Sequence, residues 1–136
     1  VEENQFNFDL ISMHDIPRDV HAALFHCAAV TVHPTFFEGI IGALPFYESL
    51  SVGTPVIIAR GPHTEELLEV APELEKFVFD PYDIDELAYL ILRISHDREA
   101  TVDFQMPIYT ELARYGWDQV ATAYAEASIS KSEHQA

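Results

Sequence analysis

The chain has few basic residues. Only seven Lys and Arg stand against 23 Asp and Glu among its 136 residues, and the formal net charge is −16 at pH 7. Because lysine and arginine supply most of the affinity for a nucleic-acid backbone, this balance argues against nucleic acid as a partner. An anionic membrane surface is disfavoured for the same electrostatic reason. The acidic side chains between residues 65 and 86, with Lys76 as the one lysine among them, are expected to form a solvated face.

Cysteine and long apolar runs are also scarce. The single cysteine, Cys27, cannot form an internal disulfide, which fits a reducing compartment better than a secreted disulfide scaffold. We expect it to lie in the core, on the apolar side of a helix. No apolar run approaches the ~18 residues of a membrane span, so the chain is not expected to be transmembrane. The N-terminal VEENQFNF has no signal-peptide character, and the absence of an initiator methionine suggests a piece of a longer chain.

The order of the apolar segments predicts an α/β fold. With 49% hydrophobic residues, the chain can bury the core of one domain. Strands alternating with helices at this spacing are typical of a parallel sheet with right-handed crossovers. Strands are expected over 6–11, 29–33, 55–59 and 76–80. Helices are expected over 18–28, 45–52 and 63–70, from Asp83 onward, and over 99–114 and 117–130. One domain therefore spans 1–136, with the sheet and crossover helices in 1–98, C-terminal helices in 99–130 and a polar tail in 131–136.

Two of these helices have further expected features. In the helix that opens at Asp83, this residue and Glu86 have the spacing of a capping box. The buried stripe expected on that helix comprises Ile84, Leu87, Ala88, Ile91, Leu92 and Ser95. In the last helix, Trp117 and Tyr124 are interpreted as core anchors, or as contacts with another domain.

The segment "FFEGIIGALPFYESLSVGTPVI", residues 36–57, contains the most informative pattern. Pro45 suits the first turn of a helix, and Gly53 suits the left-handed residue that ends one. The loop before this helix starts at the carboxyl end of strand 29–33, where ligands of open α/β sheets bind. Glu38 begins the loop and Glu48 lies one turn inside the helix, so both are expected to face the same crevice. Composition alone also permits two solvated carboxylates, and it does not distinguish nucleotides, flavins and phosphosugars.

Four segments, in order, resemble the retaining family-4 glycosyltransferases. "HPTFFEG…LPFYESLSVGTPVI" is similar to the family pattern P-S/T-x-x-E-G-F-G-x-P-x-x-E-A-x-A-x-G-T-P-V-I. "IPRDVHAALFHCAAVTVHPT", "FDPYDIDELAYLILRI" and "YGWDQVATAY" resemble three weaker elements of the same family. The resemblance covers roughly residues 12 to 125. The variant with Phe-Tyr-Glu and Ser-Val-Gly-Thr-Pro resembles the polysaccharide mannosyltransferases of that family.

The resemblance implies most of the C-terminal, donor-binding half of a GT-B enzyme, an incomplete Rossmann-like domain. In the family the first glutamate, here Glu38, contacts the donor sugar and is assigned to transition-state stabilisation, whereas the second, here Glu48, binds the ribose hydroxyls. The loop backbone lies along the sugar and the diphosphate, and its residues here are Gly39, Ile40, Ile41, Gly42, Ala43 and Leu44. Thr64 is expected either to cap the helix after strand 55–59 or to touch the nucleotide.

The resemblance also implies the partners. The donor is a nucleoside-diphosphate sugar, and no metal or other cofactor is expected. A glycan or lipid-linked acceptor binds through an N-terminal domain that these residues lack, so the chain is expected to be inactive alone. A cytoplasmic location is implied, with a peripheral position at the inner membrane for the full-length enzyme.

Two departures from the family pattern stand out. The family usually places its second glutamate eight positions after the first, whereas Glu48 follows Glu38 by ten. The two additional residues fall in the sugar-facing loop, which makes the role of Glu48 firmer than that of Glu38. The basic residues that grip the diphosphate in the family lie upstream, and no arginine here matches them.

The sequence gives less support to metal binding, to serine hydrolysis and to a regulatory role. The histidines show no metal-ligand spacing, and His33, at a strand end, is interpreted as a packed or hydrogen-bonded structural residue. Ser49 and Ser51 lack the context of a hydrolase nucleophile. The alternative that remains is a non-catalytic α/β interaction or regulatory module, although the acidic cluster and strand-end lysine of a receiver are absent.

Overall fold

The computed structural model describes residues 11–39, 42–114 and 116–133. The strand expected over 6–11 lies outside these ranges except for Ile11, which is not in a strand. Three strands are present in the described part of the chain: β1 (Thr31–His33), β2 (Val56–Ala59) and β3 (Val78–Phe79).

The three strands form one parallel sheet in the order β1-β2-β3. Val32 pairs with Ile57 and Ile58 pairs with Val78, so β2 lies in the centre. All four residues of β2 are buried, as a continuous apolar run predicts for a parallel strand covered on both faces. The predicted α/β class with a parallel, Rossmann-like sheet is confirmed.

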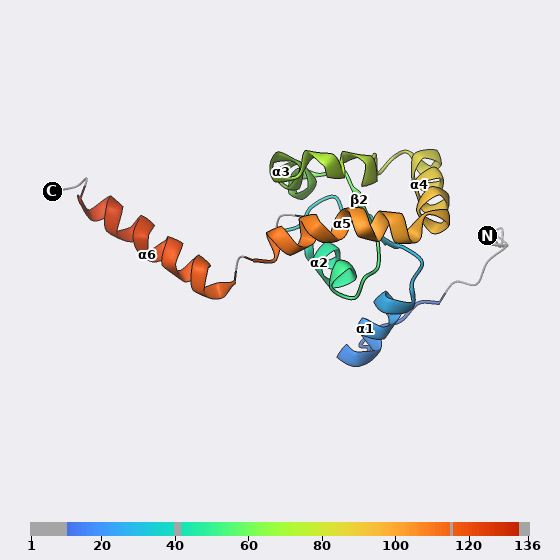
Figure 1. The fold of residues 1–136 in the computed structure, drawn as a ribbon, viewed down its shortest axis with the longest axis horizontal. Helices are drawn as coiled ribbons and strands as arrows, with labels where there is room; N and C mark the ends of the chain where they lie inside the picture. The colour runs from blue at the N-terminus through green and yellow to red at the C-terminus, as the bar shows by residue number, and fades with distance from the viewer. Residues whose placement is uncertain (1–10, 40–41, 115, 134–136) are drawn as a thin grey trace, which may run out of the picture.

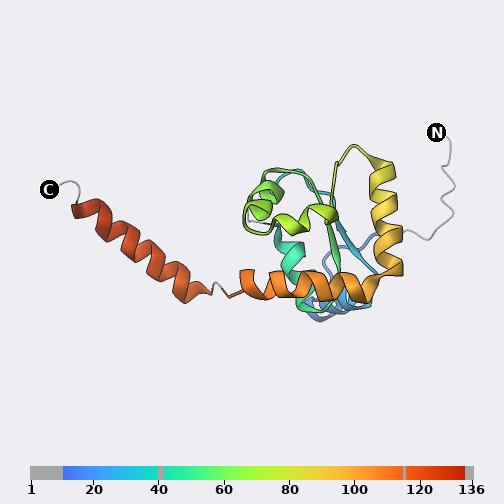
Figure 2. The same cartoon turned by 45° about the horizontal axis from the view of Figure 1, so that its top comes forward.

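Helices connect the strands and cover the sheet (Figure 1). In chain order they are α1 (Arg18–Cys27), α2 (Leu44–Ser51), α3 (Pro62–Val70), the 3₁₀ helix η1 (Pro72–Phe77), α4 (Ile84–His96), α5 (Arg98–Leu112) and α6 (Trp117–Glu133). In both views α6 extends away from the sheet and the other helices (Figures 1 and 2). The helix bounds lie close to those expected, but residues 131–133 belong to α6 rather than to the tail.

The core lies between β2 and the helices around it. Phe46 and Leu50 of α2, Leu67 of α3 and Leu90 and Ile94 of α4 are all at most 4% exposed. These side chains come from helices that lie between and after the strands, so the sheet and three helices share one apolar interior.

A buried amide ties α5 to the sheet. Gln105 is fully buried, its Oε1 accepts a hydrogen bond from the Val56 backbone N at 3.1 Å, and its Nε2 donates to the Val56 carbonyl at 2.9 Å. Arg98, at the start of α5, donates to the Gly53 carbonyl at 3.1 Å. The first contact reaches β2 itself and the second reaches the turn between α2 and β2, so α5 fixes the end of the helix that bears Glu48 relative to the strand.

Three expectations about secondary structure and burial are wrong. Residues 76 and 77 close η1, so the strand expected from residue 76 is only Val78–Phe79. Cys27 is exposed, because α1 buries no residue among those described. Tyr124 is 73% exposed on the projecting α6 and is not a core anchor.

The buried stripe of α4 is rotated from the expected one. Leu87, Leu90, Ile91 and Ile94 face the core, at the i, i+3, i+4 and i+7 spacing of one helix face. Ala88 and Ser95 are exposed, and Ile84 and Leu92 are 79% and 62% exposed. The apolar residues of α4 occupy two faces, and only one of these faces packs against the core.

In the described part of the chain no helix is both long and apolar enough to cross a membrane.

Candidate active site

The carboxyl ends of the three strands lead into the loops that position the candidate site. The loop after β1 contains Glu38, the turn after β2 contains Gly61, and the turn after β3 contains Asp80. In open parallel sheets this edge is the one where ligands bind.

Glu38 lies beside a histidine of the strand that precedes it. His33 is the last residue of β1 and is 7% exposed, and its Nε2 lies 3.3 Å from Oε1 of Glu38. The two atoms lie close together without the alignment of a hydrogen bond, since His33 Nε2 has no hydrogen-bond partner within the described ranges. The Glu38 side chain is 32% exposed, so the carboxylate touches both the protein and solvent.

A second histidine packs behind the first. The rings of His33 and His63 have centroids 6.0 Å apart at an interplanar angle of 83°, an edge-to-face contact. His63 is 1% exposed in the first turn of α3, and neither of its ring nitrogens has a hydrogen-bond partner in the part of the chain that is described. Burial is the main cause that lowers the pKa of His63, and the nearby His33 lowers it further, while Glu38 and Glu66 oppose the change. His63 is therefore neutral at pH 7.

The turn after β2 supports the Glu38 loop. A Cβ atom on Gly61 would lie 2.5 Å from the Phe36 carbonyl oxygen and 3.0 Å from Cε1 of His63. Only glycine therefore permits the loop to pass this close to α3. Further along the same loop, the Gly42 backbone N donates to the His63 carbonyl at 3.0 Å. The loop therefore meets Gly61 before Glu38 and α3 after it.

The described part of the glycine loop has an unusual backbone. Gly42 has φ +73°, and Ala43 has φ 67° and ψ 152°, a region that is nearly restricted to glycine. Such a conformation costs about 1–3 kcal/mol and is found preferentially at ligand sites. Ala43 is fully buried, Leu44 is 54% exposed, and Ile40 and Ile41 lie outside the described residues.

The helix that bears Glu48 lies within one residue of the bounds predicted for it, 45–52. α2 starts at Leu44 with Pro45 in its first turn, and Gly53 beyond its end has φ +76°. Glu48 is partly exposed in the second half of this helix. It therefore comes from a different element than Glu38, and the expectation that both carboxylates face one crevice stays a prediction.

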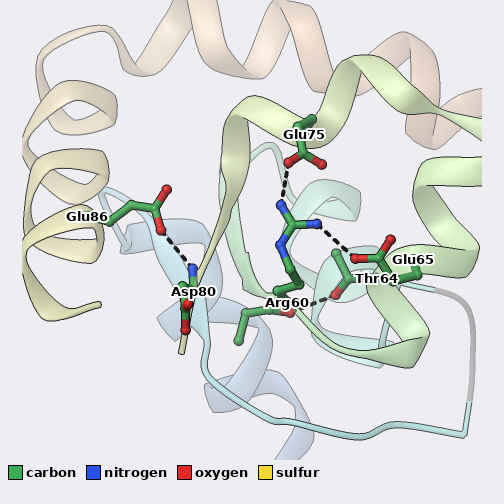
Figure 3. Close-up of polar contacts among 7 residues, drawn as sticks. Arg60, Thr64, Glu65, Glu75, Asp80 and Glu86 are labelled. Carbon is green, nitrogen blue, oxygen red and sulfur yellow. Dashed lines mark hydrogen bonds and ion pairs between the residues drawn. The ribbon is translucent and has the colours of Figure 1, made fainter. Parts of the chain in front are cut away.

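Thr64 and Arg60 are engaged within the protein (Figure 3). Thr64 is fully buried, and its hydroxyl donates to the Ala59 carbonyl at 2.7 Å. It does not cap the first residues of α3, so the prediction that it caps this helix is wrong. Arg60 Nη1 lies 2.8 Å from Oε1 of Glu65, and Nη2 pairs with Glu75. The hydrogen bonds to Glu75 and Glu65 raise the pKa of Arg60. This arginine is thus bound by two carboxylates.

The turn after β3 is held by the start of α4. The Asp83 side chain accepts a hydrogen bond from the Glu86 backbone N at 2.9 Å, the helix cap that was predicted. Glu86 Oε2 accepts from the Asp80 backbone N at 2.7 Å (Figure 3), rather than from Asp83 as in a complete capping box. Tyr82 in this turn reaches the Phe36 ring, with the centroids 5.5 Å apart. The aromatic pair joins the loops after β1 and β3.

The part of the site that the sequence pattern missed is the contact of His33 with Glu38. The only signal for this contact in the sequence was the position of His33 at the end of a strand, directly before the loop.

No group of three His, Cys, Asp or Glu side chains suited to a metal ion is found among the described residues.

Comparison with protein families identifies the class of the protein. The family model described as "Glycosyl transferases group 1" matches residues 6–107, about three quarters of the chain. The chain therefore belongs to the group 1 glycosyl transferases, and glycosyl transfer is the chemistry of its family. Searches of curated proteins and of solved structures gave no match.

Proposed function

We propose that this chain is the donor-binding part of a retaining, metal-independent glycosyltransferase that transfers a hexose from a nucleoside-diphosphate sugar. The observation that supports this most is the position of Glu38, at the carboxyl end of β1 in the loop that leads into α2. Ionised carboxylates are acceptor-only groups and so suit the vicinal hydroxyls of sugars.

Glu38, Glu48 and the loop of residues 39–44 keep their predicted roles in this proposal, whereas the fully buried Thr64 takes a supporting one. Glu38 stabilises the transition state at the sugar, and Glu48 binds the ribose hydroxyls. The loop of residues 39–44 lies along the sugar and the diphosphate, where backbone N–H groups at the start of α2 favour the negative charge of the leaving group. Thr64 supports this surface from beneath through its bond to Ala59.

The proposal extends to the whole enzyme. An N-terminal domain supplies the acceptor site, for a glycan or lipid-linked acceptor, and the basic residues that bind the diphosphate lie upstream, near the start of the donor-binding domain. In this proposal the projecting α6 packs on the N-terminal domain. The enzyme would work in the cytoplasm or at the inner face of the membrane, in polysaccharide synthesis.

A turnover screen on the full-length protein tests the proposal. GDP-mannose, UDP-glucose and UDP-N-acetylglucosamine are offered as donors, and release of the nucleoside diphosphate is measured. One donor is expected to turn over in the wild type and not in Glu38→Ala, with Glu99→Ala, exposed at the start of α5, as the control. Full activity of Glu38→Ala would contradict the proposal. The gene is expected to encode roughly 200 further residues before this chain, the length of a second domain.

A further inference from the structure

We propose that His33 is a positioning residue for Glu38, which it orients toward the donor sugar, and that His63 is the wall against which His33 is fixed. The inference rests on the proposed function, in which Glu38 is the carboxylate that meets the sugar. It adds two residues to the site, neither of which the sequence pattern indicated.

The first argument is the rigidity of His33. This residue belongs to β1, whose backbone pairs with the central strand through the His33–Ile58 register, and its side chain is almost completely buried. Glu38 instead lies in a loop and is about one-third exposed. A contact between a fixed ring and a loop carboxylate restricts the carboxylate. With Oε1 of Glu38 engaged 3.3 Å from Nε2, Oε2 is outside that contact and can accept a bond from a ligand.

The second argument concerns His63. Its ring is buried edge-to-face against His33, without a hydrogen-bond partner in the described chain, and stays neutral at pH 7. A buried polar ring that satisfies no bond of its own normally destabilises a protein, so its position calls for another explanation. In the proposal, His63 does not compete with His33 for the Glu38 carboxylate. Its ring instead blocks rotation of the His33 side chain away from Glu38.

The third argument is that the loop itself is held in place. The Phe36 carbonyl passes over Gly61 with no room for a Cβ atom, and Gly61 in turn borders the ring of His63. The loop between His33 and Glu38 is therefore packed against the same histidine that supports His33. The contact of His33 with Glu38 follows from this packing and not from the free rotation of one side chain.

Binding of a nucleotide with and without its sugar separates positioning from simple packing. Calorimetric titrations on the full-length protein compare GDP with GDP-mannose and UDP with UDP-glucose. His33→Leu is expected to weaken binding of the nucleotide sugar roughly 10-fold, about 1.4 kcal/mol, because the Glu38 carboxylate loses the side chain that restrains it. Its affinity for the bare nucleotide should stay as in the wild type. His33→Gln, whose amide N–H can replace Nε2, should recover most of the loss, and His96→Leu, on the surface of α4, should have no effect.

Two outcomes would overturn the inference while the proposed function stands. One is an unchanged affinity of His33→Leu for the nucleotide sugar. The other is a loss in His33→Gln as large as in His33→Leu, which would indicate packing alone. A melting curve of each variant shows whether it is folded.

A donor-independent measurement covers the case in which no nucleotide binds, an outcome that would count against the proposed function. The ¹⁵N resonance of His33 Nε2 is recorded in the wild type, in Glu38→Gln and in Glu48→Gln. It should shift in Glu38→Gln only. An Nε2 resonance that does not respond to Glu38→Gln would overturn the contact itself.

Discussion

The backbone carbonyl oxygen of Phe36 lies directly over Gly61, so close that a Cβ atom there would stand 2.5 Å from it. The contact joins the loop after β1 to the turn after β2. Both loops lie at the carboxyl edge of the sheet, and one of them contains Glu38. The position of the Glu38 carboxylate thus depends on Gly61, because only glycine leaves room for the Phe36 carbonyl.

Gly61→Ala should therefore displace the Glu38 loop. Relief of a 2.5 Å contact with backbone requires the loop to move, and overpacking of this kind costs about 1–3 kcal/mol. Urea denaturation measures the free energy of unfolding. Gly39→Ala, in the Glu38 loop itself, is the matched control, because a Cβ atom at Gly39 meets nothing within 4 Å. Equal stability of the two variants would contradict the prediction.

Gly42→Ala should destabilise the protein more than Gly53→Ala. Both glycines have positive φ, +73° and +76°, so each alanine pays a left-handed penalty of about 1–2 kcal/mol. At Gly42 the added Cβ would also lie 3.1 Å from Cδ2 of Leu67, whereas at Gly53 it meets nothing within 4 Å. Thermal unfolding of the pair isolates the packing cost. A smaller loss in Gly42→Ala would show that the loop does not pack on α3 as described.

Gln105→Leu should lower the free energy of unfolding by about 2–4 kcal/mol, although leucine is apolar and of similar size. The substitution removes both side-chain bonds to Val56 and leaves its backbone N–H and C=O short of partners in the core. Asp103→Leu, at an exposed position on the same helix, is the control and should change stability by less than ~1 kcal/mol. Equal losses in the two variants would contradict the role of Gln105.

The stability of the protein should fall below pH 6.5 because of His63. Its pKa in the folded protein is lowered from the ordinary value of 6.5, so between the two values the unfolded chain binds more protons. The free energy of unfolding then decreases as the pH falls from 6.5, by at most about 1.4 kcal/mol per pH unit for one proton. Denaturation from pH 7 to 5.5, where carboxylates stay ionised, measures the slope.

His63→Leu provides the comparison for that slope. It should flatten the stability curve in this range, whereas His96→Leu, at an exposed site, should leave it as in the wild type. A slope that persists in His63→Leu would assign the proton uptake to another group.

Local signals in the sequence were enough to place α2. Pro45 and Gly53 act through their own backbone angles, so they mark its start and end without reference to the rest of the fold. The apolar run of β2 was informative for the same reason, since a strand buried on both faces needs no polar residue.

Burial and side-chain contacts could not be predicted in the same way. α4 has apolar residues on two faces, and which face packs is decided by α5 and the sheet, not by the helix itself. The contact between His33 and Glu38 depends on a loop path that is set by Gly61, far along the chain. The residue types of the candidate site were visible in the sequence, but the interactions that orient them were not.

Nucleoside-diphosphate binding tests the proposed donor site most directly. The melting temperature of the protein is measured with GDP and with UDP, for the wild type, for Glu48→Ala and for the distant control Glu126→Ala. One nucleotide should raise the melting temperature of the wild type and of Glu126→Ala, because a ligand that binds only the folded state stabilises it. Glu48→Ala should show no such rise. No shift with either nucleotide, or an undiminished shift in Glu48→Ala, would contradict the assignment of a donor site to this domain.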